Sequence, residues 1–460
     1  MDLLLTHGYF LFEDPKELRI MKPYAPLGLL YLSSYLRRRG FDVELYDTTF
    51  GTREELFRLL ETEKPAVLGI SGNLLTRKNV VAITQYARQA GWIVVLGGPE
   101  PANYPREYLE AGAHVIVEGE GEATLEELLV ALRGRRADAL EAVRGVWFRD
   151  ACGRIVRTPP RPLIADLDSL PWPDRERLDL KRYLQVWREH HGAGSLSLIT
   201  ARGCPYHCRW CSHSVFGKTH RRRSPEDVAA EVAWVLERYQ PDMLWYADDV
   251  FTIHHSWILR FAEVMGQRKL RVPFECITRA DRLNSQMADA LAALGCFRVW
   301  IGSESGSQRI LDAMERGVRV EQVREAIQLC RSRGIETGMF VMWGYEGEDV
   351  QDIETTVAHV VAAQPDVFLT TVAYPIKGTP YYDGVADRLV LPGPWSQSTD
   401  RDYRIAGRHS RRFYEFADLW LKSAVTLSKL EAGSPQATAL QAEIERARRG
   451  LAESYAEVEA

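Results

Sequence analysis

Short apolar segments alternate with helical segments along most of this 460-residue chain, and this alternation constrains the fold more than any other feature. The segments of residues 1–135 that predict strands are DLLLTHG, DVELYD, AVLGISG, WIVVLGG and VIVEGEG. The stretches between them, such as TRKNVVAITQYARQAG, have the apolar spacing of helices. Near-continuous apolar strands separated by helices are typical of parallel sheets with both faces covered. We therefore expect an α/β fold that begins with a doubly wound parallel sheet.

Small residues follow three of these strands at their carboxyl ends. They are Ser71, Gly97, Gly98 and Gly119. Ligands of doubly wound sheets bind beyond this edge, and a glycine lets the backbone approach a bulky ligand closely. The alternative is that each glycine serves only a tight strand-to-helix turn.

A second series of strands and helices occupies residues 195–376, where the pattern repeats six times. Its strands are predicted at LSLIT, MLWYAD, FECIT, VWIGS, GMFVMW and VFLTTVAY. Six such units predict part of a TIM-like barrel, whose chemistry gathers at the carboxyl ends of the strands. We expect this partial barrel to span residues 191–380.

The remaining segments are predicted to connect and complete these two parts. Residues 136–190 read as a hairpin that turns at Asp150–Gly153, followed by a proline-rich linker. Residues 381–408 are loop-like, and the last thirty or so predict a loose terminal helix within a C-terminal region of 381–460. Between them, one helical stripe is expected to close the barrel, and the alternative is that it binds a membrane surface. The stripe consists of Phe413, Phe416, Trp420, Ala424 and Leu427.

Composition excludes several classes of protein. Hydrophobic residues make up 46% and charged residues 26%, which are ordinary values for a globular chain. The net charge of −5 gives no electrostatic footprint for nucleic acid. No run of 18 apolar residues predicts a membrane span, and the acidic start MDLLL is unlike a signal peptide. Seven cysteines, an odd number, favour a reducing, cytoplasmic setting.

Three of the seven cysteines fall in one loop after the first barrel strand, in TARGCPYHCRWCSHS. Cys204, Cys208 and Cys211 could hold an iron–sulfur cluster with one iron left without a protein ligand. They could instead bind zinc, with His213 as a fourth ligand, or be three unrelated buried thiols. The spacing favours the cluster. Cys276, Cys296 and Cys330 are predicted to be small core residues.

The stretch CPYHCRWC resembles the signature of the radical S-adenosylmethionine (SAM) superfamily. Five downstream stretches resemble the later motifs of one subgroup of this superfamily. They are WYADDVFT, ECITRADRL, IGSESGSQRILDAMERG, GMFVMWGYEGE and AYPIKGTPYY. That subgroup carries an N-terminal domain similar to cobalamin-binding modules. Here KPYAPLGLLYLSSYLRRRGFDVELYD and VIVEGEGEATLEELL resemble such a module, so residues 1–135 are expected to form it.

The resemblance implies cofactors and site residues. A 4Fe–4S cluster would be held by Cys204, Cys208 and Cys211, and SAM would chelate the open iron. Trp210 and Gly344 would lie beside the adenine of SAM, and Glu304 would bind its ribose. The amino group of SAM would meet the segment of Asp248 and Asp249, and its carboxylate would meet Arg279. Cobalamin would lie over the sheet edge near Ser71, Gly97, Gly98 and Gly119. For the acids and Arg279, the alternative is a solvated residue or an ion pair.

Two further expectations concern charged residues. Glu275 and Arg279 share one face of the third barrel strand and, if buried, are expected to pair. The basic run Arg221–Arg223 is expected to be a solvated loop; the alternative is a site for an anionic group of the substrate.

The resemblance implies a cobalamin-dependent enzyme that methylates an unactivated carbon of a small molecule or natural product. Flavodoxin or ferredoxin would be the reducing partner. An alternative is a cyclase, ring-contracting enzyme or dehydratase of the same build that does not use cobalamin for methylation. A transfer-RNA methylthiotransferase is disfavoured, because residues 1–151 contain no cysteine. A zinc-stabilised binding protein is the non-enzymatic alternative.

The N-terminal region also lacks an Asp-x-His-x-x-Gly stretch, which in many cobalamin proteins places a histidine under cobalt. Its only histidines are His7 and His114. We therefore expect any bound cobalamin to have its nucleotide tail detached from cobalt, with no histidine nitrogen in its place.

Overall fold

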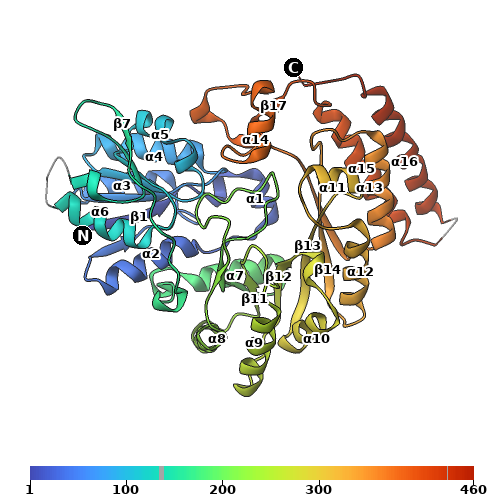
Figure 1. The fold of residues 1–460 in the computed structure, drawn as a ribbon, viewed down its shortest axis with the longest axis horizontal. Coiled ribbons are helices and arrows are strands. Elements are labelled where there is room, and N and C mark those ends of the chain that lie inside the picture. The colour runs from blue at the N-terminus through green and yellow to red at the C-terminus, as the bar shows by residue number, and fades with distance from the viewer. Residues whose placement is uncertain (134–138, 432–433, 460) are drawn as a thin grey trace. The chain divides into compact units, whose positions relative to one another are not determined.

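The computed structural model describes residues 1–133, 139–431 and 434–459 (Figure 1). The chain forms two compact units. The first comprises Met1–Pro205, Ser212–Trp245 and Gly393–Thr399, and the second comprises Tyr206–Cys211, Tyr246–Pro392 and Asp400–Ala460. The boundary predicted between residues 135 and 136 lies outside the described residues.

The N-terminal sheet has seven strands in the order β2-β1-β3-β4-β5-β6-β7. Neighbouring strands from β2 to β5 are parallel, as predicted, whereas β6 and β7 are antiparallel additions. The strands are β1 (Leu3–His7), β2 (Val43–Leu45), β3 (Val67–Ser71), β4 (Ile93–Gly97), β5 (Val115–Val117), β6 (Val146–Arg149) and β7 (Ile155–Arg157). The last two form the predicted hairpin, whose turn is held by the Asp150 carboxylate accepting from the backbone of Cys152 and Arg154. The strand prediction is therefore confirmed.

Helices cover both faces of this sheet (Figure 1). They are α2 (Leu27–Arg38), α3 (Arg53–Thr62), α4 (Arg77–Gln89), α5 (Pro105–Ala111) and α6 (Glu122–Arg133). Leu36 of α2 and Leu128 of α6 belong to one apolar core, while Leu60 of α3 and Val80 of α4 belong to another. Two separate cores on one sheet are what a doubly wound fold requires.

Two helices were not predicted. One is α1 (Pro15–Ile20), a short helix capped by the Asp14 side chain. The other is α7 (Leu180–His191), which lies within the segment predicted to be a linker. Its start is capped by Asp179, and it ends at Gly192 in the left-handed conformation (φ 75°). Leu180, Tyr183, Leu184 and Trp187 of α7 are buried, so the linker ends in a packed amphipathic helix.

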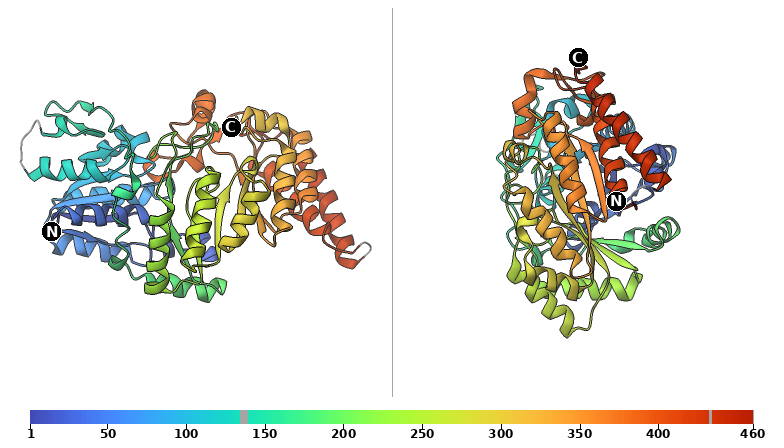
Figure 2. Two further views of the ribbon diagram at one scale, coloured as in Figure 1. Left: turned by 60° about the horizontal axis from the view of Figure 1, so that its bottom comes forward. Right: turned by 90° about the vertical axis from the view of Figure 1, so that its right-hand side faces the viewer.

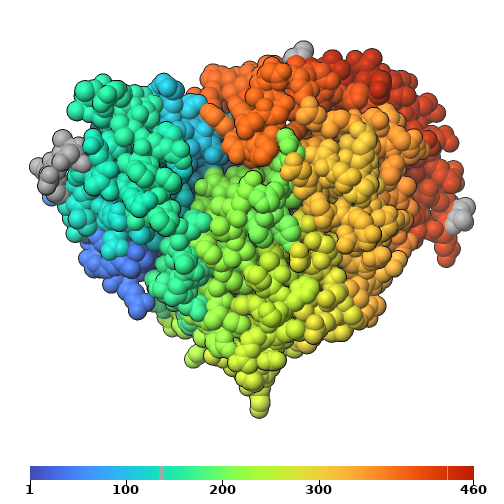
Figure 3. Space-filling view, viewed as in Figure 1, coloured from blue at the N-terminus to red at the C-terminus, as the bar shows by residue number. Residues whose placement is uncertain are grey.

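The second large sheet has the strand order β15-β14-β13-β12-β11-β8. Its strands are β8 (Ser195–Leu198), β11 (Met243–Tyr246), β12 (Phe274–Thr278), β13 (Cys296–Glu304), β14 (Glu336–Trp343) and β15 (Val367–Val372). The pairs from β12 to β15 are parallel. The helices between these strands are α8 (Pro225–Tyr239), α9 (His255–Gln267), α10 (Ser285–Leu294), α11 (Gln308–Ala313), α12 (Val320–Arg331) and α13 (Val350–Ala363). All six predicted strands and all six predicted helices are thus present, but α11 and α12 both lie between β13 and β14. The side chains of α10 and α12 form part of the visible face of the second unit (Figure 3).

The C-terminal region is more ordered than predicted. Residues 381–408 are not simply a loop, since α14 (Pro380–Val385) enters this stretch and β16 (Leu389–Val390) pairs with β17 (Arg404–Ile405). Two helices follow, α15 (Arg411–Leu427) and α16 (Pro435–Glu453), and they pack side by side (Figure 2). The Phe416 ring lies where a β-carbon on Gly450 of α16 would be, so α16 is tightly packed rather than loose.

The predicted apolar stripe of α15 is partly wrong. Phe413 and Trp420 are buried, but Phe416, Ala424 and Leu427 are only half-buried. The buried face instead includes Tyr414, Ala417 and Leu421. The reason is that α15 packs on two helices, α13 and α16, so its buried surface is wider than one stripe.

None of the helices in the described ranges is long and apolar enough to cross a membrane.

Candidate functional site

The cysteine loop begins directly after the short strand β9 (Ala201–Arg202). Gly203 makes the turn into it with φ 85°, and a β-carbon there would lie only 2.4 Å from the Thr219 carbonyl oxygen. Only glycine fits this position. Cys204 is half-buried, Cys208 is buried and Cys211 is exposed. The backbone N–H of Cys211 donates to the carbonyl of Cys208 at 3.2 Å, which closes a tight turn between these two thiols.

Two arginines surround the Cys208 thiol. Nη1 of Arg279 and Nη1 of Arg316 each lie 4.0 Å from Cys208 Sγ. A hydrogen bond with Cys211, together with the charges of Arg316 and Arg279, holds the pKa of the Cys208 thiol well below its usual range. The thiolate is the form of cysteine that binds metal. Arg316 was missed by the sequence analysis, although the stretch that contains it, DAMERG, had been singled out.

Glu304 ends β13 beside this group. It is 9% exposed and has φ 61°, the left-handed region that a non-glycine residue adopts only under constraint. The register of β13 against β14 shifts between Gly302 and Glu304, which re-aims the side chain. The pKa of Glu304 is raised to about 7, mainly by burial; the charge of Cys208 adds to this rise, whereas the charges of Arg316 and Arg279 oppose it. Its Oε1 lies 3.9 Å from Nε of Arg316.

The other predicted residues of the second unit also lie after barrel strands. Trp210 packs on an apolar cluster that contains Met342, Tyr345 and Tyr381. Asp248 is buried and Asp249 is exposed. Gly344, with φ 70°, lets the Tyr414 ring approach to 2.8 Å of where its β-carbon would be.

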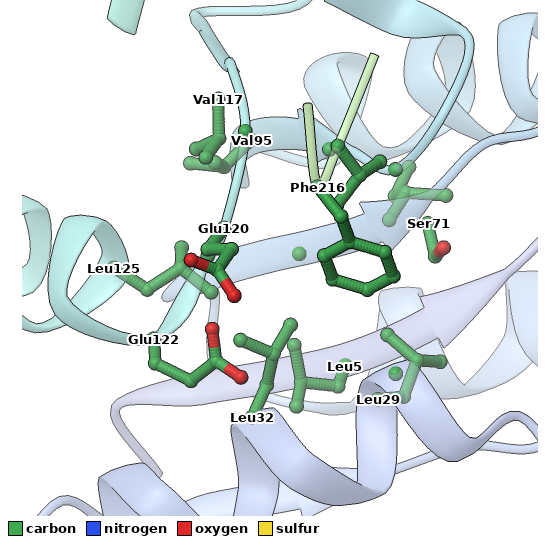
Figure 4. Close-up of a pocket in the computed structure, with 18 of the residues that line it drawn as sticks. Leu5, Leu29, Leu32, Ser71, Val95, Val117, Glu120, Glu122, Leu125 and Phe216 are labelled. Carbon is green, nitrogen blue, oxygen red and sulfur yellow. The ribbon is translucent and has the colours of Figure 1, made fainter. Parts of the chain in front are cut away.

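The first unit has a cavity at the carboxyl edge of its sheet, with a volume of about 120 Å³ (Figure 4). The predicted residues Ser71, Gly97, Gly98 and Gly119 all line it. Apolar side chains form most of the remaining wall, including Leu5, Leu29, Leu32, Val95, Val117, Leu125 and Phe216. The structure thus brings the four predicted positions together in one apolar cavity.

Glycine shapes this cavity. A β-carbon on Gly98, which has φ 98°, would lie 2.6 Å from the Gly72 carbonyl oxygen. Gly28 also lines the cavity, and no atom lies within 4 Å of where its β-carbon would be. The space beside Gly28 is therefore open to a ligand.

The comparisons with known proteins identify both parts of the chain. The model of the radical SAM superfamily matches residues 198–360, and the model of the B12 binding domain matches residues 20–129. The chain thus combines a radical SAM domain with a B12-binding domain, which matches the cobalamin-binding subgroup of that superfamily. The resemblance inferred from the cysteine loop and the later motifs is thereby confirmed.

Two curated proteins are similar to this radical SAM protein over most of its length. An uncharacterized methyltransferase of Pyrococcus horikoshii is 28% identical over 387 residues, which cover 82% of each chain. An anaerobic magnesium-protoporphyrin IX monomethyl ester cyclase of Synechocystis is 28% identical over 414 residues, covering 86% of this chain and 80% of the cyclase.

Solved structures share the fold. TsrM of Kitasatospora setae, a radical SAM methyltransferase solved with cobalamin and a [4Fe-4S] cluster, superposes with a TM-score of 0.72 at 19% identity. The match covers 98% of this chain and all of TsrM. The cobalamin-dependent radical SAM enzyme OxsB, solved with aqua-cobalamin and SAM, also gives a TM-score of 0.72 at 19% identity, covering 98% of this chain and 71% of OxsB.

The assignment of Cys204, Cys208 and Cys211 to a 4Fe–4S cluster stays a prediction. Within the described ranges, no three histidine, cysteine or acidic side chains are grouped so that they could hold one metal ion. A zinc site needs four ligands around one ion, whereas a cluster takes each thiolate on a different iron. Of the four other cysteines, Cys276, Cys296 and Cys330 are buried, as predicted, and Cys152 is exposed.

The cavity also carries a polar wall that the sequence analysis missed. The carboxylates of Glu120 and Glu122 face it (Figure 4). Arg202 donates to Glu120 at 2.7 Å and to Glu122 at 2.6 Å, and Arg221 donates to Glu120 at 2.8 Å. The one available signal was the repeated acid in EGEGE after β5 (Val115–Val117).

The two histidines of the N-terminal region are engaged elsewhere. His7 Nε2 lies 2.9 Å from the Asp47 carboxylate, and His7 Nδ1 accepts from the backbone N–H of Tyr9. His114 Nδ1 accepts from the backbone N–H of Val94 at 3.0 Å. Neither histidine lines the cavity.

The predicted pairing of Glu275 with Arg279 is wrong. Glu275 accepts from the Trp300 indole at 2.8 Å and lies 3.5 Å from Arg298, whereas Arg279 pairs with Asp281 at 2.8 Å. Both are buried, but four residues of extended strand separate them by about 13 Å. Each therefore finds a nearer partner.

The basic run 221–223 is neither a solvated loop nor an open anion site. Arg223 is 4% exposed and pairs with Asp227 at 2.6 Å and with Glu231 at 2.5 Å. Arg221 pairs with Glu120, and Arg222 donates to Thr200. Buried guanidinium groups require such partners, so the charges of Arg221 and Arg223 are already neutralised within the first unit.

Proposed function

We propose that this radical SAM enzyme depends on cobalamin and methylates an unactivated carbon of a small-molecule or natural-product substrate. The observation that carries this proposal is the pairing, in one chain, of a glycine-shaped cavity at the edge of a B12-binding domain with a cysteine motif beside buried Arg279, Glu304 and Arg316. An enzyme that only cleaved SAM would need the second feature alone.

In this proposal Cys204, Cys208 and Cys211 hold a 4Fe–4S cluster, which supplies the electron that cleaves SAM. Glu304 is well placed to accept hydrogen bonds from the ribose of SAM. It is the last residue of β13, its carboxylate is buried, and it lies beside Arg316, which in turn lies beside Cys208. Trp210 packs on an apolar cluster suited to adenine, and Gly344 lines a pocket that shares Tyr345 and Tyr381 with this cluster. Asp248, Asp249 and Arg279 remain candidates for the amino acid end of SAM.

The cavity of the first unit would receive part of cobalamin. Its mostly apolar wall, at the carboxyl edge of the sheet, suits the nucleotide tail. The corrin would then lie over the edge formed by Ser71, Gly97, Gly98 and Gly119. With His7 and His114 engaged elsewhere, no histidine of this domain is in place to bind cobalt.

The proposed chemistry implies an electron donor and a reducing compartment. A low-potential cluster needs a one-electron donor such as flavodoxin or ferredoxin, and a reducing compartment such as the cytoplasm keeps its thiols available. The negative charge of the chain argues against nucleic acid as substrate.

A second candidate has comparable support. The anaerobic magnesium-protoporphyrin IX monomethyl ester cyclase of Synechocystis is as similar in sequence as the methyltransferase of Pyrococcus horikoshii. A cyclase, ring-contracting enzyme or dehydratase of this build would consume SAM without transferring its methyl group.

Anaerobic reconstitution with iron, sulfide and cobalamin distinguishes the two. For the methyltransferase we expect one cobalamin per chain, and both 5′-deoxyadenosine and S-adenosylhomocysteine after reduction in the presence of SAM. Formation of 5′-deoxyadenosine without S-adenosylhomocysteine would favour the second candidate.

A matched pair of variants tests the cavity. Gly28→Leu should weaken cobalamin binding at least tenfold, because its side chain would fill open space at the cavity. Gly266→Leu, at a helical glycine of the second unit that likewise has no atom within 4 Å, should leave binding unchanged. Equal cobalamin content in both variants would contradict the placement.

A further inference from the structure

We propose that Arg279 and Arg316 form a fixed pair of positive charges that raises the reduction potential of the cluster through Cys208. This inference rests on the proposed function, because it assumes that the cysteine loop holds a 4Fe–4S cluster. It assigns to Arg316 a role that the motifs did not suggest, and to Arg279 a role besides contact with SAM.

The geometry places both charges on one sulfur. Arg279 follows β12 and Arg316 follows α11, so they reach Cys208 from different elements. Each Nη1 lies 4.0 Å from Sγ. Two guanidinium groups that converge on one thiolate are not explained by packing alone, since like charges brought together in a protein interior repel.

Arg279 is held rigidly by its neighbours. Its Nη2 donates to the carbonyls of Arg316 and Gly317 at 3.0 and 3.3 Å, and its Nε donates to Asp281 at 2.8 Å. The centroid of the Tyr206 ring lies 3.6 Å from the guanidinium carbon of Arg279. With three sets of contacts, Arg279 has no freedom to swing away from Cys208.

Arg316 is held less completely, and this bears on its charge. Its Nη2 donates to the Gly302 carbonyl at 2.9 Å, whereas its Nε has no hydrogen-bond partner among the described residues. The nearest carboxylate is Glu304, 3.9 Å from Nε, too far for a hydrogen bond. The charge of Arg316 is therefore only partly neutralised by the protein.

Burial makes these charges effective. Arg279 is 2% exposed and Arg316 is 7% exposed. A charge shielded from water acts over short distances far more strongly than one on the surface. The reduction potential of an iron–sulfur cluster depends on net charge, on hydrogen bonds to the sulfurs and on solvent exposure, and the two arginines change the first two of these at Cys208.

The step concerned is the transfer of one electron from a low-potential donor to the cluster. No covalent bond forms or breaks, the donor loses one electron, and the cluster gains one negative charge. Nearby positive charges stabilise that added charge, so they favour the reduced state and shift the potential to less negative values.

The test is an electron paramagnetic resonance titration of the reconstituted full-length protein, without SAM, with dithionite as the reductant. Arg316→Gln and Arg279→Gln should each shift the midpoint potential to more negative values, and the double variant should shift it further. Arg316→Lys, which keeps the charge, should lie closer to the wild type. The control Arg324→Gln removes a partly exposed arginine of α12 that pairs with Glu321, and it should leave the potential unchanged.

Iron and sulfide content must be measured in every variant. If the wild type binds no cluster, the proposed function fails. If it binds one and both Gln variants keep full iron content at the wild-type potential, only the present inference is overturned. If a Gln variant loses the cluster, Arg316→Lys and Arg279→Lys decide the matter, because both retain the positive charge. The inference then requires that both Lys variants have the wild-type midpoint potential, and a different potential would overturn it.

Discussion

Arg202 donates to the carboxylate of Glu120 at 2.7 Å, although 82 positions separate the two residues in the sequence. The same guanidinium donates to Glu122 at 2.6 Å, and all three side chains are buried. Arg202 stands two residues before Cys204, and Glu120 lines the cavity at the sheet edge. This buried cluster therefore fixes the start of the cysteine loop to the edge at which cobalamin is proposed to bind.

Replacing Arg202 with Met should destabilise the protein by about 3–5 kcal/mol, the usual cost of leaving buried charges without their partner. Chemical denaturation of the apo protein measures this as a lower free energy of unfolding for the transition that includes the first unit. Arg154→Met is the control, because Arg154 is 79% exposed in its ion pair with Asp150 and should contribute less than about 1 kcal/mol. Equal effects would show that Glu120 and Glu122 do not need Arg202.

Replacing Cys204, Cys208 or Cys211 with Ala should abolish reductive cleavage of SAM and lower the iron content of the reconstituted protein. Cys330→Ala should spare both, because Cys330 is a buried core residue of α12. Formation of 5′-deoxyadenosine, followed by chromatography, is the measurement. Full cleavage by the Cys204→Ala protein would refute the assignment of the cluster.

Glu304→Gln should weaken SAM binding by about 10- to 100-fold while the cluster remains. The reason is the loss of hydrogen bonds to a charged group, worth about 1.5–3 kcal/mol. Equilibrium binding measured anaerobically, with iron content as the control, provides the check. An unchanged affinity would assign Glu304 another task.

Bound cobalamin should carry no axial nitrogen on cobalt. Of the two histidines in the N-terminal region, His7 is bonded to Asp47 and His114 to the backbone of Val94. The electron paramagnetic resonance spectrum of the cob(II)alamin state should then lack hyperfine splitting from nitrogen. A nitrogen splitting would contradict this prediction, and His7→Ala and His114→Ala would identify its source.

Stability should fall with rising pH because of Glu348, a buried residue of the loop after β14. Burial raises the pKa of its carboxyl to about 8, above the ordinary value of 4.5. The folded protein then binds this proton more tightly than the unfolded chain does. The resulting stabilisation is complete below about pH 4.5 and is lost as the pH rises through 8.

Glu348→Gln keeps a neutral side chain at every pH and can still accept the hydrogen bond from Gly344 N–H. Its thermal midpoint should therefore exceed that of the wild type increasingly between pH 6 and pH 9. Parallel curves for the two proteins would show that Glu348 does not titrate in this range.

Much of the fold could be predicted from local pattern. The strands β1 to β5 and the six barrel units were found because parallel strands buried on both faces leave unbroken apolar runs in the sequence. Helix α1 was missed because a six-residue helix leaves a weak periodic signal. Helix α7 is amphipathic, but it was missed because the proline-rich linker was extended across it. The buried face of α15 was misjudged, since its width depends on how many neighbours the helix has.

The sequence by itself determined the cysteine spacing, the positions at strand ends and the family to which they belong, since all of these are encoded in residues close together in the chain. Only the tertiary structure decided which charges meet. It paired Arg202 with Glu120, turned Arg279 from Glu275 to Asp281, and brought Arg316 to Cys208. Charges act over a few ångströms in space whatever their separation in sequence, and periodicity carries no record of which distant segments will lie that close.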